Sequence, residues 1–320
     1  MNRKVVVTDH TFPDLAAEQA AAREAGADFA AYQCKTDAEV AEAVAGADAV
    51  AVQFAAFGPL AAASVKPGAT VIRYGVGYDN IDLAAARAAG LKVGYVPDYC
   101  ADEVADHTAA AILTLLRRLA GLDRSVRAGE WAAVRVASPL KPSSETVIGF
   151  FGMGQIGRAV RARLAGFGFR FIAADPGLTP DLAKAAGVTL VDNGGLLAQA
   201  DLISLHAPAT AETTGFFNAE RLARMQPHAM IVNSARGLLI DEDDLAAALV
   251  AGTIGGAALD VFRTEPLPAA SPLRSAPNCL LTPHAAWYSD AAIGRLQGLV
   301  AGDLARALRG EPPRKPVPNP

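Results

Sequence analysis

Three polar residues in the second half of the chain, Arg236, Glu265 and His284, carry side chains that together can act on a carbonyl substrate. Each follows a short apolar run that predicts a buried strand, and ligands of open parallel sheets bind beyond the carboxyl ends of the strands. We therefore expect the three to converge. A histidine beside a carboxylate exchanges protons, and an arginine holds a carboxylate through two parallel hydrogen bonds. The set predicts hydride transfer to a carbonyl, with one group that anchors the substrate and another that supplies the proton.

A glycine-rich loop upstream of these residues fits the pattern G-x-G-x-x-G. It consists of Gly152, Met153, Gly154, Gln155, Ile156 and Gly157. The first glycine allows a tight turn, the second lets the backbone approach a pyrophosphate, and the third lets helix and strand pack closely. The loop follows an apolar strand and opens a helix, whose N-terminal N–H groups and dipole favour phosphate. This context predicts a dinucleotide site rather than an ordinary glycine turn.

Asp175 supplies the feature that accompanies such a loop. It ends the next predicted strand, 175 − 157 = 18 residues after the last glycine. A carboxylate at this place accepts hydrogen bonds from the ribose hydroxyls and repels a 2′-phosphate, and no arginine follows it directly. The sequence therefore predicts NAD as the cofactor, preferred over NADP.

The elements that must position these residues alternate along the chain in two series. Short apolar runs predict strands at 5–7, 49–52, 71–72 and 92–93, and then at 146–151, 169–173, 202–205, 230–232, 254–259 and 280–281. Alanine-rich helical stretches separate them, which is the pattern of buried parallel strands joined by helices. A long helix over 102–119 and an irregular arm over 129–144 divide the two series. We predict an α/β fold with two doubly wound, parallel-sheet domains.

Composition excludes several classes of protein. The chain has 320 residues, 52% of them hydrophobic and 19% charged, which is enough apolar material for real cores. The net charge of −4 disfavours nucleic acid and anionic membranes as partners. Three scattered cysteines predict neither disulfides nor a metal site, and indicate a reducing cytoplasm. The initial apolar run, 5–7, is too short for a signal peptide, and no run reaches membrane-spanning length.

Taken in order, these motifs resemble those of the D-isomer-specific 2-hydroxyacid dehydrogenases over nearly the whole chain. The matching segments are the glycine loop 152–157, 233–237 around Arg236, 258–262 with Glu265, and 282–284, preceded by 75–82 in the first series. Within that family, residues 284–289 and Arg73 are similar to the C-terminal-binding protein branch. Tyr95 departs from the asparagine that much of the family has before its Val-Pro pair.

The resemblance implies a domain organisation. Residues 1–100 plus 287–320 would form a discontinuous substrate domain, and 101–286 the NAD-binding domain, with a cleft that closes by hinge motion. The family is typically dimeric through its nucleotide domains, so a homodimer is expected, to which the arm 129–144 can contribute.

The resemblance also implies residue roles. His284 would be the general acid/base, Glu265 its partner, and Arg236 the group that grips a 2-oxo acid. Backbone N–H groups at Val76 and Gly77 would bind the substrate carboxylate. Besides the glycine loop and Asp175, the positions that match the cofactor site are Thr108, His206, Pro208, Ser234, Ala235 and Asp260.

Two further residues have competing interpretations. Arg73 is either a second anchor for the substrate carboxylate or part of a structural ion pair, and Trp287 is either a wall of the substrate pocket or a packed indole. If Trp287 lines the pocket, it favours a substrate with a medium-sized side chain over glyoxylate alone.

We expect an oxidoreductase that interconverts a 2-oxo acid and a D-2-hydroxy acid. Two alternatives remain at this point. One is an NAD(H)-sensing, corepressor-like binding protein that turns over little substrate. The other is an enzyme of the same fold that oxidises formate or phosphite, since those branches share the core motifs.

Overall fold

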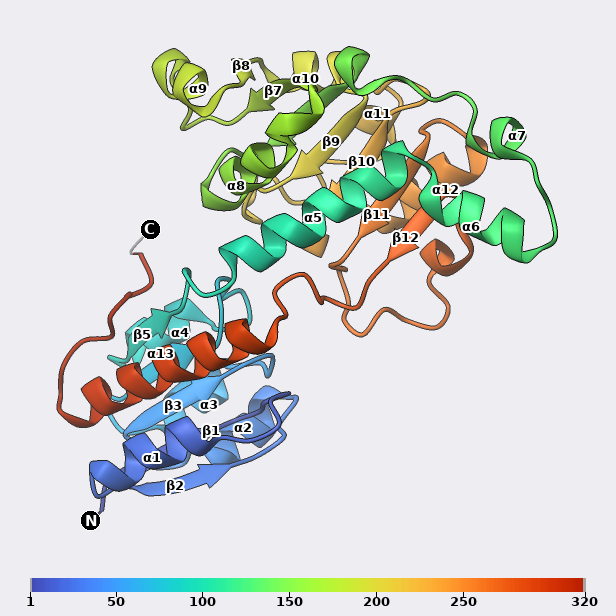
Figure 1. Cartoon of the computed structure of the whole chain (residues 1–320). Helices are drawn as coiled ribbons and strands as arrows, with labels where there is room; N and C mark the ends of the chain where they lie inside the picture. Colours follow the sequence, from blue (N-terminus) through green and yellow to red (C-terminus); the bar gives the residue numbers. More distant parts are fainter. Residues whose placement is uncertain (1, 319–320) are drawn as a thin grey trace. The chain divides into compact units, whose positions relative to one another are not determined.

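The computed structural model describes residues 2–318 and confirms the predicted α/β class (Figure 1). The chain forms two compact units, Met1–Cys100 with Ser289–Pro320, and Ala101–Tyr288. Each unit has one sheet, and all strand pairs described within the two sheets are parallel. Within residues 2–318, no helix combines the length and apolar character needed to cross a bilayer.

The chain passes from the second unit back to the first between Tyr288 and Ser289, so Trp287 lies in the second unit. Hydrogen bonds explain this position. The N–H of Tyr288 donates to the carbonyl of Ala285 at 3.0 Å, and the N–H groups of Ala285 and Ala286 donate to Asp260, so the turn is tied to the second unit. Ser289 then caps the helix that belongs to the first unit, by accepting from the N–H of Ala292.

The first unit contains a five-stranded sheet of order β2-β1-β3-β4-β5. Its strands are β1 (Lys4–Val7), β2 (Asp28–Ala31), β3 (Ala49–Val52), β4 (Thr70–Arg73) and β5 (Lys92–Tyr95). Successive side chains of a strand point to opposite faces, so strands that are apolar throughout require helices on both sides. One face is covered by α2 (Asp37–Ala43), α3 (Pro59–Ser64) and α4 (Leu83–Ala88). Elsewhere α13 (Asp290–Leu308) packs on β3 and β4 and on α1 (Ala16–Glu24).

The second unit contains a seven-stranded sheet of order β12-β11-β10-β9-β6-β7-β8. Its strands are β6 (Val147–Phe151), β7 (Arg170–Ala174), β8 (Thr189–Leu190), β9 (Leu202–Leu205), β10 (Met230–Asn233), β11 (Gly256–Leu259) and β12 (Cys279–Leu281). The strand order reverses between β6 and β9. Ligands of such sheets bind at this switch point, beyond the carboxyl ends of the strands.

Helices cover both faces of this sheet. On one side lie α5 (Ala101–Leu116), α8 (Gln155–Leu164) and α9 (Pro180–Ala186). On the other lie α10 (Asn193–Gln199), α11 (Ala219–Leu222) and α12 (Glu242–Ala251). The seven strands and their two helical layers confirm the doubly wound arrangement.

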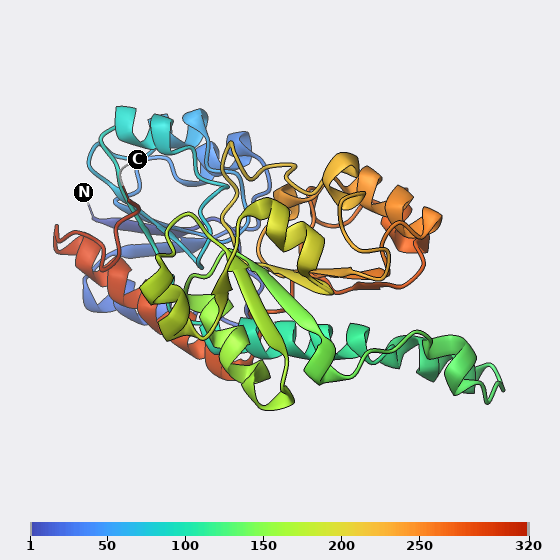
Figure 2. The ribbon, with the colours of Figure 1, turned by 90° about the horizontal axis from the view of Figure 1, so that it is seen from above.

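The long helix expected over 102–119 is interrupted. α5 ends at Leu116, and α6 (Leu119–Arg127) begins after Arg118, whose backbone is left-handed with φ of 55°. The Arg118 guanidinium donates to the Gly255 carbonyl at 2.8 Å, which fixes the break against the body of the unit. The region expected to be irregular also contains a short helix, α7 (Ala133–Ala137). Figure 2 shows α6 and α7, in green, extending away from the rest of the second unit.

His206 packs at the switch point, directly after β9. Its Nε2 lies 2.9 Å from the hydroxyl of Ser204, and its ring stacks on Phe150 with 5.9 Å between ring centres. Burial lowers the pKa of His206 to about 3. The imidazole is therefore neutral at physiological pH, so it shapes this part of the sheet edge without adding positive charge.

This burial predicts a contribution of His206 to acid sensitivity. The unfolded histidine takes up a proton near pH 6.5, whereas the folded one does so only near 3. Below pH 6.5 the unfolded state binds more protons, so the stabilisation that His206 gives is full above that pH and is lost as pH falls toward 3. In urea titrations at pH 7, 6, 5 and 4, the unfolding free energy should fall less steeply with acid in His206→Gln than in the unmodified protein. Equal slopes would contradict the assignment.

Candidate active site

Arg236, Glu265 and His284 lie in the loops that follow three neighbouring strands, β10, β11 and β12. These strands are parallel and level with one another, since Asn233 pairs with Leu259 and Leu259 with Leu281. Their carboxyl ends therefore share one edge of the sheet, and the three loops start there. The sequence placed these residues after strands, and the strand order makes them neighbours.

His284 and Glu265 form a direct pair. The Nδ1 atom of His284 lies 2.6 Å from Oε2 of Glu265, and both side chains are 32% exposed. The other carboxylate oxygen, Oε1, accepts the N–H of Phe262 at 2.9 Å. Burial raises the pKa of Glu265, but the hydrogen bond and charge of His284, the Phe262 N–H and the charge of Arg236 outweigh it, so the pKa lies below its ordinary value. Glu265 is thus an ionised carboxylate that holds the Nδ1 proton of His284 and fixes the direction of its ring.

The loop carrying Arg236 packs tightly on the loop carrying Glu265. A Cβ at Gly237 would overlap the Phe262 carbonyl group, so only glycine permits this approach. Asn233, 1% exposed, braces the same loop, because its amide accepts the N–H of Ala235 at 3.0 Å and donates to the Arg236 carbonyl at 2.9 Å. We did not single out Asn233 from the sequence. Its signal was an amide at the end of an otherwise apolar strand.

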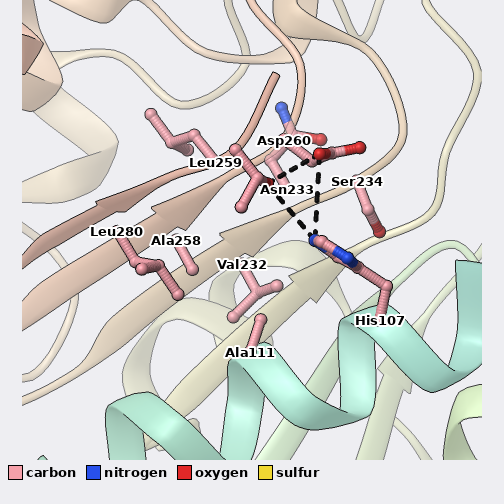
Figure 3. Close-up of a pocket in the computed structure, with 10 residues that line it drawn as sticks. His107, Ala111, Val232, Asn233, Ser234, Ala258, Leu259, Asp260 and Leu280 are labelled. Atoms are coloured by element: carbon pink, nitrogen blue, oxygen red, sulfur yellow. Dashed lines mark hydrogen bonds and ion pairs between the residues drawn. The ribbon is translucent and has the colours of Figure 1, made fainter. Parts of the chain in front are cut away.

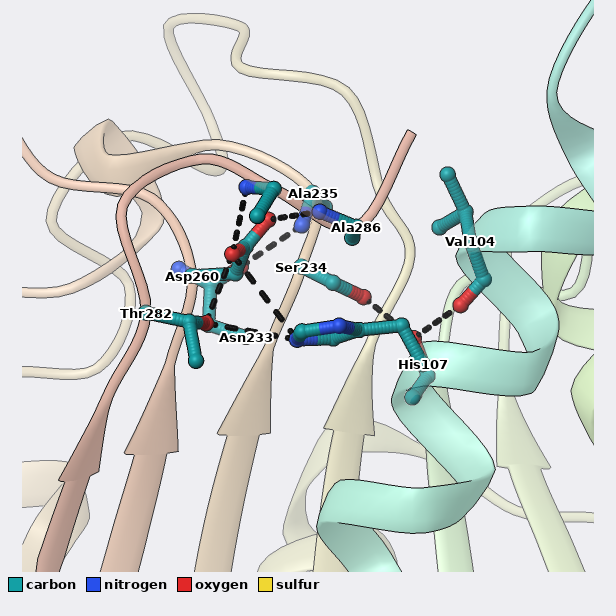
Figure 4. A network of polar contacts seen from close by, with 10 residues as sticks. Val104, His107, Asn233, Ser234, Ala235, Asp260, Thr282 and Ala286 are labelled. Carbon is teal, nitrogen blue, oxygen red and sulfur yellow. Dashed lines mark hydrogen bonds and ion pairs between the residues drawn. The ribbon is translucent and has the colours of Figure 1, made fainter. Parts of the chain in front are cut away.

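Asp260 is buried and contacts the turn that carries His284. Its carboxylate is 3% exposed and accepts the N–H groups of Ala285 and Ala286, at 2.8 and 2.9 Å, and the hydroxyl of Thr282 at 2.6 Å (Figure 4). The N–H of His284 also donates to the main-chain carbonyl of Asp260, at 2.8 Å. The sequence predicts Asp260 at the cofactor site, and in the structure its carboxylate also shapes the turn that carries His284.

The glycine loop fits an anionic group of the kind that a dinucleotide presents. Gly152 has φ of 91°, and a Cβ there would lie 2.7 Å from the N atom of Ala207, so the turn after β6 meets the loop after β9. A Cβ at Gly157 would lie 2.9 Å from the carbonyl oxygen of Gly152. Gly154 has open space on its Cβ side, and no side chain caps the N-terminus of α8. The first N–H groups of this helix, at Gln155, Ile156 and Gly157, are therefore available to a phosphate.

Asp175 lies at the end of β7, beside this loop. Its Oδ2 accepts the N–H of Met153 at 2.6 Å, and its Oδ1 accepts the N–H of Gly177 at 2.7 Å. A carboxylate has about four acceptor positions, so two remain for the hydroxyls of a ribose. These two contacts hold the side chain in place before any ligand binds.

The other expected cofactor residues of this unit occupy the same sheet edge. The hydroxyl of Thr108, on α5, is buried and lies 2.6 Å from that of Ser234, which follows β10 together with Ala235. Pro208 follows His206 after β9 and is exposed. Between α5 and the ends of β10 to β12 lies a small pocket, drawn in Figure 3. It is lined by His107, Asn233, Ser234, Asp260 and Thr282 at its polar end and by apolar side chains elsewhere.

The expected substrate residues are divided between the units. Arg73 ends β4 in the first unit, where its Nη1 donates to the Tyr74 carbonyl at 2.6 Å. A Cβ at Gly75, whose φ is 135°, would overlap that guanidinium, so glycine leaves it room. Val76 and Gly77 follow in the same loop. Trp287 lies in the second unit, edge-on to Tyr288 with 5.9 Å between ring centres.

Comparisons with known proteins agree with this geometry. Residues 109–286 match the model of the D-isomer specific 2-hydroxyacid dehydrogenase, NAD binding domain. A glyoxylate reductase of Korarchaeum cryptofilum is 40% identical over 248 residues, which span 76% of this chain and 74% of that protein.

Two solved structures are similar over almost their full length. D-lactate dehydrogenase from Aquifex aeolicus, complexed with NAD and lactic acid, has a TM-score of 0.87 and 26% identity, covering 99% of both chains. An NADPH-dependent glyoxylate/hydroxypyruvate reductase from Sinorhizobium meliloti has a TM-score of 0.83 and 29% identity, covering 99% of this chain and 97% of that one. With the paired histidine and glutamate and the glycine loop in place, this chain belongs to the D-isomer-specific 2-hydroxyacid dehydrogenases, the NAD-dependent oxidoreductases that interconvert 2-oxo acids and D-2-hydroxy acids.

Proposed function

We propose that His284 is the general acid/base of this reaction, that Glu265 orients it, and that Arg236 binds the substrate. The observation that carries the proposal is the 2.6 Å contact between Nδ1 of His284 and the Glu265 carboxylate. Because Nδ1 is held by the carboxylate, the proton exchanged with substrate is the one on Nε2. NADH, when bound, supplies the hydride for the carbonyl carbon, and NAD⁺ accepts it in the reverse direction. His284 protonates the carbonyl oxygen during reduction and takes the hydroxyl proton during oxidation.

The substrate we propose is a small 2-oxo acid. Its carboxylate would be bound by the backbone N–H groups of Val76 and Gly77, with Arg73 as a second anchor, while Arg236 polarises the carbonyl. Trp287, next to the loop of His284, would form a wall against the substrate side chain. The relative from Korarchaeum cryptofilum is a glyoxylate reductase, and the similar structure from Aquifex aeolicus holds lactic acid, a small 2-hydroxy acid.

A panel of 2-oxo acids tests this proposal. We expect NADH oxidation with at least one of glyoxylate, hydroxypyruvate, pyruvate, 2-oxo-4-methylthiobutyrate and phenylpyruvate. His284→Ala should lower kcat about 10²- to 10⁴-fold, because a positioned general acid contributes that much. NADH binding, followed by its fluorescence, should be retained.

His228→Ala is the matched control. His228 also contacts a carboxylate, Asp201, but just before β10 at the other end of the strands. This variant should keep the activity of the unmodified protein. Tight NADH binding without turnover of any acid would instead favour the NAD(H)-sensing alternative. Parallel loss of turnover and NADH binding in His284→Ala would contradict the role given to His284.

We propose further that NAD is preferred over NADP. Asp175 stands beside the glycine loop, where its negative charge would repel a 2′-phosphate, and its two backbone contacts fix it there. The Sinorhizobium meliloti relative is NADPH-dependent, so members of similar structure differ in this choice.

Asp175→Asn tests the preference. The amide keeps an acceptor oxygen but loses the charge, so the ratio of kcat/KM for NADH to that for NADPH should fall by roughly tenfold or more. Asp181→Asn, an exposed carboxylate on α9, is the control and should leave the ratio unchanged. An unmodified protein that uses both cofactors equally well would refute the proposal.

We propose that the protein is a homodimer and that the α6–α7 arm contributes to the contact between the two copies. The arm exposes large apolar side chains: Leu119 is 51% exposed, Val126 55%, Trp131 94% and Val134 81%. Such a cluster on an element that extends from the body (Figure 2) is typical of a surface covered by a partner. A second copy of the chain offers the same apolar arm, so a symmetric pairing would cover both.

Sedimentation velocity of Trp131→Ser/Val134→Ser at micromolar concentration tests this proposal. The double variant should sediment as a monomer, or dissociate at least tenfold more readily, while the unmodified protein sediments as a dimer. Val250→Ser removes a side chain that is 72% exposed on α12 and should leave the dimer intact. A monomeric unmodified protein would refute the proposal.

We also propose that the protein works in the cytoplasm. The sequence has three cysteines, Cys34, Cys100 and Cys279, and their wide and irregular spacing fits a reducing compartment.

A further inference from the structure

The turn that carries His284 is held in an unusual backbone conformation. His284 has φ of 52°, in the left-handed region that non-glycine residues rarely adopt. Hydrogen bonds before and after His284 in the chain stabilise this unfavourable backbone conformation. Before it, the hydroxyl of Thr282 donates to Oδ1 of Asp260, and after it, the N–H groups of Ala285 and Ala286 donate to the same carboxylate. The conformation of the turn therefore depends on Asp260 and on what keeps the Thr282 hydroxyl directed at it.

His107 reaches this cluster from another element, α5. Its Nε2 lies 3.2 Å from Oγ1 of Thr282 and 3.8 Å from Oδ1 of Asp260 (Figure 4). The helix is fixed at this point, because α5 packs on β10 and β11 and the next residue, Thr108, is fully buried and contacts Ser234. The imidazole, 28% exposed, also forms part of the polar end of the pocket in Figure 3.

The direction of these hydrogen bonds follows from the groups involved. At 2.6 Å from a carboxylate oxygen, the single hydroxyl proton of Thr282 is donated to Asp260. Toward His107, the Thr282 hydroxyl can therefore act only as an acceptor. The Nε2–H group of His107 is the donor in this hydrogen bond. The chain of donation runs from His107 to Thr282 to Asp260, and each bond polarises the next.

From this arrangement we infer that His107 is a positioning residue for His284. By donating to Thr282 it keeps that hydroxyl aimed at Asp260, and Asp260 holds the turn in the conformation that places the His284 ring against Glu265. The inference rests on the role proposed above for His284, and it adds a residue from α5, outside the loops that carry the chemistry.

Kinetics of two His107 variants test the inference. His107→Leu replaces the imidazole with an apolar side chain of similar bulk and so removes the donor. The kcat should fall about three- to tenfold, which is the effect of one lost hydrogen bond, with little change in KM for NADH. His107→Gln places an amide N–H close to the former Nε2 and should restore most of kcat. His228→Leu, at the opposite end of the strands, is the matched control and should leave kcat unchanged.

A double-mutant cycle with Thr282→Val tests whether His107 acts through the Thr282 hydroxyl or independently of it. If His107 acts through the Thr282 hydroxyl, His107→Leu should cost nothing further once that hydroxyl is gone. Additive losses in the double variant would overturn the inference, as would full activity of His107→Leu or failure of His107→Gln to recover.

Trp287 gives a readout that does not require turnover. The chain has two tryptophans, so in a Trp131→Phe background the fluorescence reports on the turn that follows His284. His107→Leu and Thr282→Val should increase acrylamide quenching of Trp287, and His107→Gln should not. If the unmodified protein turned over no 2-oxo acid, the proposed function would fail while this measurement still tested the coupling. Unchanged quenching in both variants would overturn the inference itself.

Discussion

The carboxylate of Asp260 is the group on which the arrangement of the site depends. A buried, unpaired charge costs several kcal/mol, so a carboxylate that is 3% exposed persists only with its oxygens satisfied. The donors come from the turn after β12, which must therefore fold over the end of β11. That requirement places His284, in left-handed backbone, within the stretch that Asp260 binds, and brings its ring to Glu265. Loss of the carboxylate would leave both the buried donors and the strained turn without support.

The register of β10, β11 and β12 brings the three loops of the site together. Because Asn233, Leu259 and Leu281 are partners across β10, β11 and β12, the three loops leave the sheet at the same level. Gly237 then allows the first loop to touch the second, and the first loop carries Arg236. The site is thus assembled from short connections on rigid strands, an arrangement that limits the conformational entropy lost when a ligand binds.

Much of this could be predicted from the sequence, because the signals are local. The glycine loop and Asp175 have a fixed relation to a strand and a helix, and apolar runs marked most of the strands. The orientation of a helix is not local: His107 lies in a helix whose sequence does not reveal which face meets the ends of the strands. For the same reason the contacts between Asp260 and the turn after β12 could not be predicted, since only the folded structure shows the carboxylate turned toward Ala285. The break at Arg118 was also missed, because its cause is the Gly255 carbonyl, far along the chain.

Two carboxylates at this sheet edge, those of Glu265 and Asp175, are both held by backbone N–H groups. Glu265 accepts the N–H of Phe262 with one oxygen and contacts His284 with the other. Asp175 accepts the N–H of Met153 with one oxygen and that of Gly177 with the other. A side chain anchored in this way has already lost its rotamer freedom during folding, so a ligand does not have to order it. Backbone N–H groups also hold the oxygens of a carboxylate in place without a further side chain that would occupy space needed by a ligand. The site thereby has carboxylates of fixed orientation beside His284 and beside the glycine loop 152–157.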